Sequence, residues 1–451
     1  MRVAKIVGDP NPGLRSAVLH GIYDLMWLLV GLIGSPVWLW RAVRVQDFRD
    51  MLAERTGWRR TELPDLEPGR RRVLIHAVSV GEVKGAQSLV RRLQSERPDL
   101  EPVISTTTGT GLKVGQDLFP ELTVLRFPAD ASPIIERFVR RVDPVVVLLI
   151  ELEVWPNFLR AANRRGVPIV VVNGRITESS FGMYKVFRRF FPQFNRISLF
   201  CVQNETYSDR FTQLSVEPER ILITGNVKVD GLGLASVEPS AELRGYVRGP
   251  SSQLVFVAGS THEPEEERVL GAWRAGAPEM RLVLVPRHPK RAHELARRLG
   301  ELGARPQLLT DLRAGAETLD GDRPLLVDTV GELEHVFGAA DLAFIGGSLI
   351  PRGGQNVLEP AAQGLPVLTG PSNHNFVQET QLLSEAGASS TVEDHEHLAR
   401  ELRRLADDPA IGQRMGALGR AAIAKQRGAT DNTWEALAPI LEEAAPRTLD
   451  R

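Results

Sequence analysis

Short apolar runs alternate with amphipathic helical patterns along most of this 451-residue chain. Each run has the length of a buried strand, roughly four to eight residues, and the segments between the runs repeat apolar positions with the period of a helix. Such alternation is typical of βα units, whose strands form a parallel sheet. In the first half the predicted strands are Arg72–Val78, Pro102–Thr107, Thr123–Pro128, Val145–Glu151, Pro168–Asn173, Leu199–Gln203 and Ile221–Gly225.

A polar stretch at Ser236–Gln253, rich in proline, glycine and serine, interrupts this alternation and is typical of a domain boundary. The pattern therefore predicts an α/β protein with two doubly wound, Rossmann-like domains, residues 51–240 and 241–451, facing a cleft beyond the carboxyl ends of their strands. The last amphipathic run, Thr430–Ala444, is long enough to pack back across the interface. The strands predicted in the second half are Leu254–Gly259, Arg281–Pro286, Pro324–Asp328, Leu342–Gly346 and Pro366–Thr369.

Residues 1–50 are patterned as a membrane anchor. Leu25–Trp40 is an uncharged run of 16 residues, shorter than the roughly 20 of a perpendicular span, and Gly34-Ser35-Pro36 should kink it. Aromatic residues typical of an interfacial belt lie near its ends, namely Tyr23, Trp27, Trp38 and Trp40. We expect a segment that spans or is embedded in the membrane; the alternative is a buried core helix.

Basic residues follow this apolar segment. From Arg41 to Arg72 there are nine Arg against six Asp and Glu, a balance of +3, whereas Met1–His20 has three basic residues against one acid. Because positive residues flank the cytoplasmic end of a membrane segment, we expect the large remainder of the chain in the cytoplasm.

The overall composition is that of an ordinary globular protein, with 43% hydrophobic residues, 25% charged residues and a net formal charge of -1. This charge gives no reason to expect a nucleic-acid partner. The single cysteine, Cys201, cannot form an intramolecular disulfide and has no companions with metal-ligand spacing. A cysteine-based zinc site is thereby excluded, and a reducing compartment is expected.

A glycine-rich loop, Phe344–Pro360 (FIGGSLIPRGGQNVLEP), connects an apolar strand to a helix in the second half. Its two glycine pairs permit positive φ and a close backbone approach, and the following helix offers N–H groups at its N-terminus. The loop is therefore a candidate phosphate cradle. The alternative is a tight strand-to-helix turn.

Two acidic motifs in the first half are candidates for catalysis. In HAVSVGE, Glu82 falls in the first turn of a helix, where it serves either as an N-terminal cap or as a general base. The helix dipole lowers the pKa of such a carboxylate and burial raises it. In IELEVWPNF, Glu151 and Glu153 follow a strand and would share one face toward the ligand crevice. The alternative is ion pairing with Arg160, Arg164 or Arg165.

A basic aromatic segment, Arg175–Arg196, holds five basic residues against one acid, interleaved with six aromatic residues. This composition favours contact with an anionic lipid surface; the alternative is a core helix with a solvated basic edge. In the second half, Arg287 and His288 end a strand, and Arg287 could neutralise a phosphate. His288 is more typical of a structural hydrogen bond. Thr329–Glu332 (TVGE) starts a helix with backbone donors.

Several motifs follow one another in an order that covers nearly the whole chain. They are the apolar N-terminal segment, HAVSVGE, ELEVWPN, VVNGRITESSF, ITGNVK, AGSTHEPEE, VPRHP, GELEHVFGAADLAFIGGSL and GGQNVLEPAAQGLPVLTGP. Together they resemble the 3-deoxy-D-manno-octulosonic acid (Kdo) transferase family of lipid A assembly in lipopolysaccharide biosynthesis.

The resemblance implies a GT-B fold and an inverting, metal-independent glycosyltransferase that moves Kdo from CMP-Kdo to a hydroxyl of the lipid A precursor. Residues 51–240 would bind the acceptor and residues 241–451 the CMP-sugar. Glu82 matches the family's catalytic base, and Glu151 or Glu153 could orient the acceptor or support positive charge on the sugar. The positions that match the family's CMP contacts are Pro286, Arg287, Val330, Gly331, Glu332, Asn356, Val357, Leu358 and Glu359. Gln355 stands where the family often has histidine.

Two other functions are consistent with the same patterns. One is a different GT-B enzyme, either a UDP-sugar transferase or a nucleotide-sugar epimerase, although the membrane segment weighs against a soluble epimerase. The other is a non-catalytic nucleotide-binding module tethered to the membrane.

Overall fold

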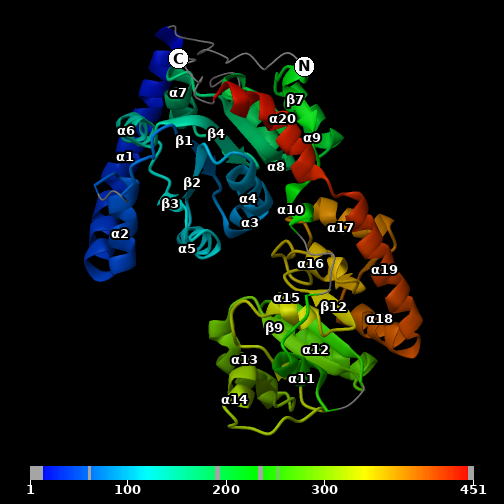
Figure 1. Cartoon of the computed structure of the whole chain (residues 1–451). Coiled ribbons are helices and arrows are strands. Elements are labelled where there is room, and N and C mark those ends of the chain that lie inside the picture. The colour runs from blue at the N-terminus through cyan, green and yellow to red at the C-terminus, as the bar shows by residue number, and fades with distance from the viewer. Residues whose placement is uncertain (1–13, 59–61, 188–192, 232–236, 251–252, 445–451) are drawn as a thin grey trace. The chain divides into compact units, whose positions relative to one another are not determined.

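The computed structural model describes residues 14–58, 62–187, 193–231, 237–250 and 253–444, and the structural statements below concern these residues. Contacts divide the chain into two compact units (Figure 1). Unit 1 comprises Met1–Gly231 and Arg427–Arg451, and unit 2 comprises Leu232–Gln426. The assignment of acceptor and donor domains to residues 51–240 and 241–451 stays a prediction.

Unit 1 is built on a seven-stranded parallel sheet in the order β3-β2-β1-β4-β5-β6-β7. Its strands are β1 (Arg71–His76), β2 (Leu100–Thr106), β3 (Thr123–Arg126), β4 (Pro144–Ile150), β5 (Ile169–Gly174), β6 (Leu199–Val202) and β7 (Ile221–Ile223). Its helices are α1 (Leu14–Arg44), α2 (Gln46–Arg55), α3 (Val80–Gly85), α4 (Gln87–Glu96), α5 (Gly109–Leu118), α6 (Ser132–Val142), α7 (Pro156–Arg164), α8 (Glu178–Phe187), η1 (Gln193–Arg196), α9 (Glu205–Gln213), η2 (Pro218–Arg220), α10 (Val227–Asp230) and α20 (Ala429–Glu443).

Both faces of this sheet are buried, which explains its continuous apolar runs. Along β4, Val147 and Leu149 join a core with α6 and α7, whereas Val146, Leu148 and Ile150 join a core with α3, α4 and α20. This split follows the two-residue period of a strand. The last helix, α20, red in Figure 1, thus completes the core of unit 1 with Trp434 and Leu437.

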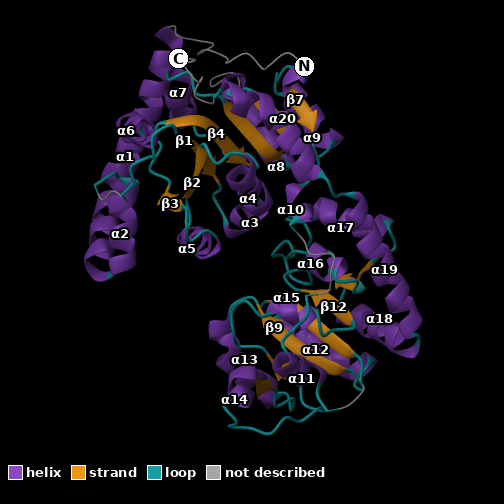
Figure 2. Ribbon diagram, in the orientation of Figure 1, coloured by secondary structure: helices purple, strands orange, loops and turns teal. Residues whose placement is uncertain are grey.

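Unit 2 repeats the architecture, with helices packed around a sheet (Figure 2). The sheet is parallel and seven-stranded, in the order β10-β11-β9-β8-β12-β13-β14. Its strands are β8 (Val255–Thr261), β9 (Arg281–Pro286), β10 (Gln307–Leu308), β11 (Leu325–Leu326), β12 (Leu342–Ile345), β13 (Val367–Thr369) and β14 (Ser389–Thr391). Its helices are α11 (Ala241–Arg248), α12 (Glu265–Gly276), η3 (Pro289–Arg291), α13 (Ala292–Glu301), α14 (Leu309–Arg313), α15 (Leu333–Phe337), α16 (Leu358–Ala362), α17 (Val377–Glu385), α18 (His395–Asp407) and α19 (Pro409–Lys425).

These two sheets confirm the predicted pair of doubly wound α/β domains. All twelve predicted strands overlap strands of the structure, and the structure adds β10 and β14. Both additional strands are two or three residues long and lie at the edges of their sheet. They are too short for their sequence to show a periodic pattern.

The long apolar helix predicted near the N-terminus is present as α1, which continues through Pro36 without a break in its assignment. Within it, Val18–Arg44 has a mean hydropathy of 1.6 and is long and apolar enough to cross a membrane. Its side chains are largely exposed, with Ile33 and Leu32 at 78% and 61%. The alternative of a buried core helix is therefore wrong.

Polar groups at the start of α1 attach this helix to the rest of unit 1. The His20 ring Nδ1 hydrogen-bonds to Asn157 Oδ1 at 2.8 Å. The Asp24 carboxylate accepts from Asn157 Nδ2 at 2.8 Å and from the Ser132 backbone N–H at 2.9 Å. The hydrogen bonds of the Asp24 carboxylate are thus provided by residues of unit 1 outside α1.

Candidate active site

Glu82 is held in the turn between β1 and α3 by its own neighbours. Ser79 caps α3 and accepts a hydrogen bond from the Glu82 N–H at 3.4 Å. In return, the Glu82 carboxylate accepts from the Val78 N–H at 2.7 Å and from Ser79 Oγ at 2.8 Å. This reciprocal pairing resembles a capping box. The capping interpretation of Glu82 is therefore correct as far as local structure goes.

Capping does not exclude catalysis, because the environment of Glu82 favours its protonated form. The residue is only 8% exposed, and burial is the main cause that raises its pKa, followed by the negative charge of Glu151. Hydrogen bonds from Ser79 and Val78 oppose this rise, as does the charge of Lys228. A carboxylate oxygen can accept more than one hydrogen bond, so both oxygens still have capacity to accept a proton.

Glu151 lies beside Glu82 but is not presented as the sequence analysis expected. Strand β4 ends at Ile150, and Glu151 has a left-handed φ of 64°, so the shared strand face assumed for Glu151 and Glu153 does not exist. The ion pairs described for Glu151 also differ from the suggested pairing with Arg160, Arg164 or Arg165. Glu151 pairs instead with Lys228 and, at 3.4 Å, with Arg175 Nε.

Lys228 is the residue of this cluster that the sequence reasoning missed. It lies in α10, whose N-terminus is capped by Asn226, and its aliphatic chain packs against α3. A β-carbon added to Gly85 would lie 2.9 Å from Lys228 Cγ, which is closer than packed atoms allow. Gly85 therefore makes room for Lys228 between Glu82 and Glu151. The motif ITGNVK contained the signal, but only as part of a resemblance.

Glu153 is the third carboxylate of the cluster. Burial and the negative charge of Glu82 raise its pKa from an ordinary 4.5 to about 8, with a further contribution from Glu151. Trp155 Nε1 donates a hydrogen bond to Glu153 Oε2 at 3.0 Å, which opposes this rise. Three acids and one lysine thus meet at the carboxyl ends of β1 and β4, where ligands bind in parallel α/β sheets.

The basic aromatic segment has both buried and exposed residues. Phe181 and Tyr184 are partly buried against the core of unit 1. Burial, followed by the negative charge of Glu153, raises the pKa of Tyr184 to about 12. Met183 and Val186 on the same helix are 50% and 64% exposed. Residues 188–192, where much of the predicted basic charge lies, are outside the described residues.

In unit 2, the residues matched to CMP contacts lie at the carboxyl edge of the sheet, in strand ends, loops and helix starts. Pro286 ends β9 and is followed by the exposed Arg287. Val330 is 87% exposed and precedes Gly331, which has a φ of 89°. The sheet order places β11, β9 and β12 with their carboxyl ends along this edge.

Hydrogen bonds fix two of these loops. Glu332 begins α15 and accepts from Arg313 Nη1 at 2.7 Å. Asn356 Oδ1 accepts from the Leu358 N–H at 3.1 Å, and its Nδ2 donates to Glu359 Oε1 at 3.1 Å. Val357 and Leu358 are buried at the start of α16. Asn356 thus shapes the turn and orients Glu359.

The glycine-rich loop differs from the expected phosphate cradle. Its N–H groups at Gly347, Ser348 and Leu349 donate to the buried Glu265 carboxylate at 2.7, 3.1 and 2.9 Å. In the second glycine pair, Gly353 and Gly354 donate to Ser372 Oγ and to the Gly347 carbonyl. The anion that this loop holds is therefore the protein's own carboxylate, and the loop cannot cradle a phosphate through these donors.

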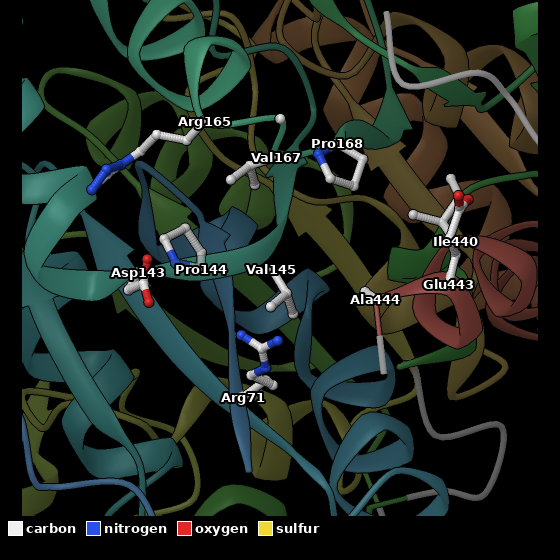
Figure 3. A pocket seen from close by; sticks show the side chains of 11 residues that line it. Arg71, Asp143, Pro144, Val145, Arg165, Val167, Pro168, Ile440, Glu443 and Ala444 are labelled. Carbon is white, nitrogen blue, oxygen red and sulfur yellow. The ribbon is translucent and has the colours of Figure 1, made fainter. Parts of the chain in front are cut away.

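Among the described residues no cluster of His, Cys, Asp and Glu has the arrangement of a metal site. Cys201 is buried in β6, as expected for a structural cysteine. A cavity of about 480 Å³ lies in unit 1 beside Arg71, Pro144 and Pro168 (Figure 3). These residues stand at the amino ends of β1, β4 and β5, so this cavity lies at the edge of the sheet opposite Glu82.

Comparison with solved structures supports the fold. A putative UDP-N-acetylglucosamine 2-epimerase from Listeria monocytogenes superposes with a TM-score of 0.57 at 15% identity, covering 83% of this chain and 97% of its own. A glycosyltransferase from Rickettsia africae gives 0.56 at 11% identity, covering 84% and 100%. At such identities the likeness shows the fold alone, which is of the GT-B type.

Comparison of sequences identifies the family. The family model of 3-deoxy-D-manno-octulosonic-acid transferase (kdotransferase) matches residues 50–231. The 3-deoxy-D-manno-octulosonic acid transferase of Haemophilus influenzae is 31% identical over 414 residues, 89% of this chain and 94% of that protein. The enzyme of the same name from Bordetella pertussis is 32% identical over 445 residues, 94% of this chain and 98% of that protein. With relatives of this identity along nearly its whole length, the chain belongs to the 3-deoxy-D-manno-octulosonic acid transferases, a family of glycosyltransferases of lipopolysaccharide biosynthesis.

Proposed function

We propose that this Kdo transferase takes Kdo from CMP-Kdo and adds it to a hydroxyl of a lipid A precursor, with inversion at the anomeric carbon and without a metal. The observation that carries the proposal is the Glu82 carboxylate, which is buried, fixed by two hydrogen bonds and raised in pKa at the carboxyl edge of its sheet. A base of raised pKa accepts a hydroxyl proton more readily.

The proposed step balances as a single displacement. The acceptor oxygen attacks the anomeric carbon as its proton passes to Glu82, the bond between that carbon and the phosphate oxygen breaks, and CMP leaves with the bonding electron pair. Unit 2 would stabilise the leaving group through Arg287, because a guanidinium is permanently charged and can form two parallel hydrogen bonds to a phosphate. Glu359, oriented by Asn356, would accept hydrogen bonds from ribose hydroxyls.

Glu151 and Glu153 have different supporting roles in this proposal. The ion pair between Glu151 and Lys228 places a fixed cation near Glu82. Glu153, with a pKa of about 8, is mostly protonated at neutral pH and could donate a hydrogen bond to the acceptor. Both carboxylates would therefore position groups, while Glu82 takes the proton.

The membrane part of the proposal rests on α1. Its exposed apolar side chains and its polar attachment through His20 and Asp24 would hold the acceptor domain at the inner membrane, on the cytoplasmic face, where the lipid acceptor and an anionic surface are found. If the full-length protein were recovered in the soluble fraction without detergent or high salt, this anchoring role would be wrong.

The donor and acceptor can be tested together. Purified protein is incubated with a lipid A precursor and either CMP-Kdo or UDP-N-acetylglucosamine, and the lipid products are weighed by mass spectrometry. The proposal predicts that the mass of the lipid increases by that of one or more Kdo residues when CMP-Kdo is the donor, and does not change when the UDP-sugar is the donor. Products formed from the UDP-sugar, or none from CMP-Kdo, would contradict it.

The nucleotide contacts need a separate measurement. Replacing Arg287 by alanine should weaken CMP binding about tenfold or more, since a charged hydrogen bond to phosphate is lost. The matched control is Arg297→Ala, an exposed arginine of α13 that pairs only with Glu301 in the described structure. Equal CMP affinity for Arg287→Ala and the control would remove Arg287 from the site.

A further inference from the structure

His262 is a histidine of unit 2 with an unused ring nitrogen. It follows β8 in the motif AGSTHE, and its backbone N–H is directed to the Glu265 carboxylate at 3.4 Å. Its Nε2 is buried and makes no hydrogen bond to any described residue. Because buried polar atoms in native proteins are nearly always paired, an unpaired imidazole nitrogen at the carboxyl end of a strand is available to a ligand.

Basic side chains lie near the His262 ring. The His288 ring packs edge-on against the His262 ring, with 5.7 Å between centroids. Burial is the main cause that lowers the pKa of His262 to about 4, and the nearby His288, Arg352, Arg287 and Arg291 lower it further. In the absence of a ligand His262 is therefore neutral at physiological pH.

Only part of this positive charge is balanced within the protein. Arg291 pairs with Glu263 and Glu266 at 3.4 and 3.3 Å, and the other nearby acid, Glu265, is occupied by the N–H groups of the glycine-rich loop. The guanidinium groups of Arg287 and Arg352 have no carboxylate partner in the described part of the chain. Two arginines without a carboxylate partner thus lie at the carboxyl ends of the strands, near the unpaired ring nitrogen of His262.

Gly347 leaves space where these side chains converge. A β-carbon at this position would lie 3.5 Å from His262 Cδ2, 3.5 Å from Arg352 Cβ and 3.7 Å from Gln355 Nε2. The residue also has a φ of 70°, which favours glycine. His262, Arg352 and Gln355 therefore surround one small volume above the glycine-rich loop, with Arg287 on the neighbouring strand end.

We propose that His262 and Arg352 form a second anion subsite, distinct from the phosphate contact of Arg287, and that this subsite binds the carboxylate of the acidic sugar in the donor. The inference rests on the proposed function, in which the donor is a nucleotide-activated acidic sugar with one phosphodiester and one carboxylate. The guanidinium group of Arg287 would bind the phosphodiester, and that of Arg352 would bind the carboxylate. The unpaired imidazole would supply a donor directed at the second anion.

Binding of a carboxylate at this subsite should change the protonation of His262. The carboxylate offsets the positive charges of Arg352, Arg287 and Arg291, which disfavour the protonated imidazole. The pKa of His262 should therefore rise on donor binding, with uptake of a fraction of a proton near pH 6. A role of His262 in structure alone would produce no such uptake.

The experiment compares CMP with CMP-Kdo on full-length protein in the absence of acceptor, by competition against a fluorescent CMP derivative. His262→Gln keeps a hydrogen-bonding group and removes the charge, and His262→Ala removes both. For both variants we expect an affinity for CMP within twofold of the unsubstituted protein and an affinity for CMP-Kdo about tenfold lower. The matched control is His293→Gln, an exposed histidine of α13 in the same unit.

Calorimetry in two buffers of different ionisation enthalpy supplies the second readout. The unsubstituted protein should take up protons when it binds CMP-Kdo near pH 6, and His262→Gln should not. Equal weakening of CMP and CMP-Kdo would assign His262 to the nucleotide phosphate and overturn the inference, as would unchanged affinities and proton uptake in both variants. If the unsubstituted protein binds neither ligand, the proposed function itself fails.

Discussion

At the scale of single residues, Glu153 is a carboxyl group that keeps its proton at neutral pH. Burial and the charges of Glu82 and Glu151 raise its pKa to about 8, whereas in the unfolded chain it is near 4.5. For a group whose pKa is higher in the folded state, the stabilising contribution is complete below the unfolded pKa. That contribution is lost as the pH rises from about 4.5 to about 8.

Replacing Glu153 by glutamine should prevent the loss of stability that the ionisation of Glu153 causes at high pH. At pH 9 we expect the variant to unfold with a free energy about 2 kcal/mol higher than the unsubstituted protein, a value reduced from the full pKa shift because the side chain is partly exposed. At pH 4 the variant should be no more stable. Urea titrations followed by tryptophan fluorescence at both pH values measure the difference, and an equal stabilisation at pH 4 and pH 9 would contradict the shifted pKa.

Lys228 should set the pH at which Glu82 becomes active as a base. Its positive charge lowers the pKa of Glu82, so Lys228→Met should raise that pKa and move the acid limb of the transfer rate to higher pH by about one unit. The control is Lys84→Met, which removes a charge from the exposed side of α3. A pH–rate profile that moves equally for both variants would mean that general surface charge, and not this contact, is responsible.

At the scale of elements, close helix contacts fix the core of unit 2. A β-carbon on Gly276, at the end of α12, would lie 2.2 Å from the Ala399 carbonyl oxygen of α18, whereas one on Gly271 of the same helix meets nothing within 4 Å. Gly276→Ala should lower the free energy of unfolding by about 2 kcal/mol or more. Gly271→Ala should raise it by up to about 1 kcal/mol, since alanine is the better helix former. Thermal unfolding of the two variants compares them, and a stable Gly276→Ala protein would show that α12 and α18 can separate without cost.

The elements also show how far the sequence could predict the fold. Continuous apolar runs of strand length located the buried parallel strands, because both faces of these strands are apolar. This pattern missed β10 and β14 because strands of two or three residues are shorter than the apolar runs it relies on. It also assumed that Glu151 continues β4, whereas a left-handed residue ends that strand and turns the carboxylate toward Lys228.

The candidate site was predictable to a similar extent. The position of Glu82 at a helix start followed from its motif, since Ser79 and Glu82 have the spacing of a cap. Its long-range neighbours did not follow, because Lys228 is far from Glu82 in the chain and nothing local indicates the contact. The hydrogen bonds from the glycine-rich loop to the Glu265 carboxylate could not be predicted for the same reason.

At the scale of the whole molecule, the groups proposed for one reaction belong to two separately folded units. Each unit has its own sheet and its own apolar core. The proposed base belongs to unit 1, and all the proposed nucleotide contacts belong to unit 2. A change at the base should therefore affect transfer and leave nucleotide binding unaltered, which is the central claim in testable form.

The most direct test is the rate of Kdo transfer by Glu82→Gln, measured beside its affinity for CMP. Glutamine preserves the size and the hydrogen bonds to Val78 and Ser79 in part but cannot take a proton. The account predicts a transfer rate lower by about 10²–10⁴-fold, with CMP affinity within twofold of the unsubstituted protein and with full activity in the control Glu96→Gln, an exposed acid of α4. Unchanged transfer by Glu82→Gln would contradict the account.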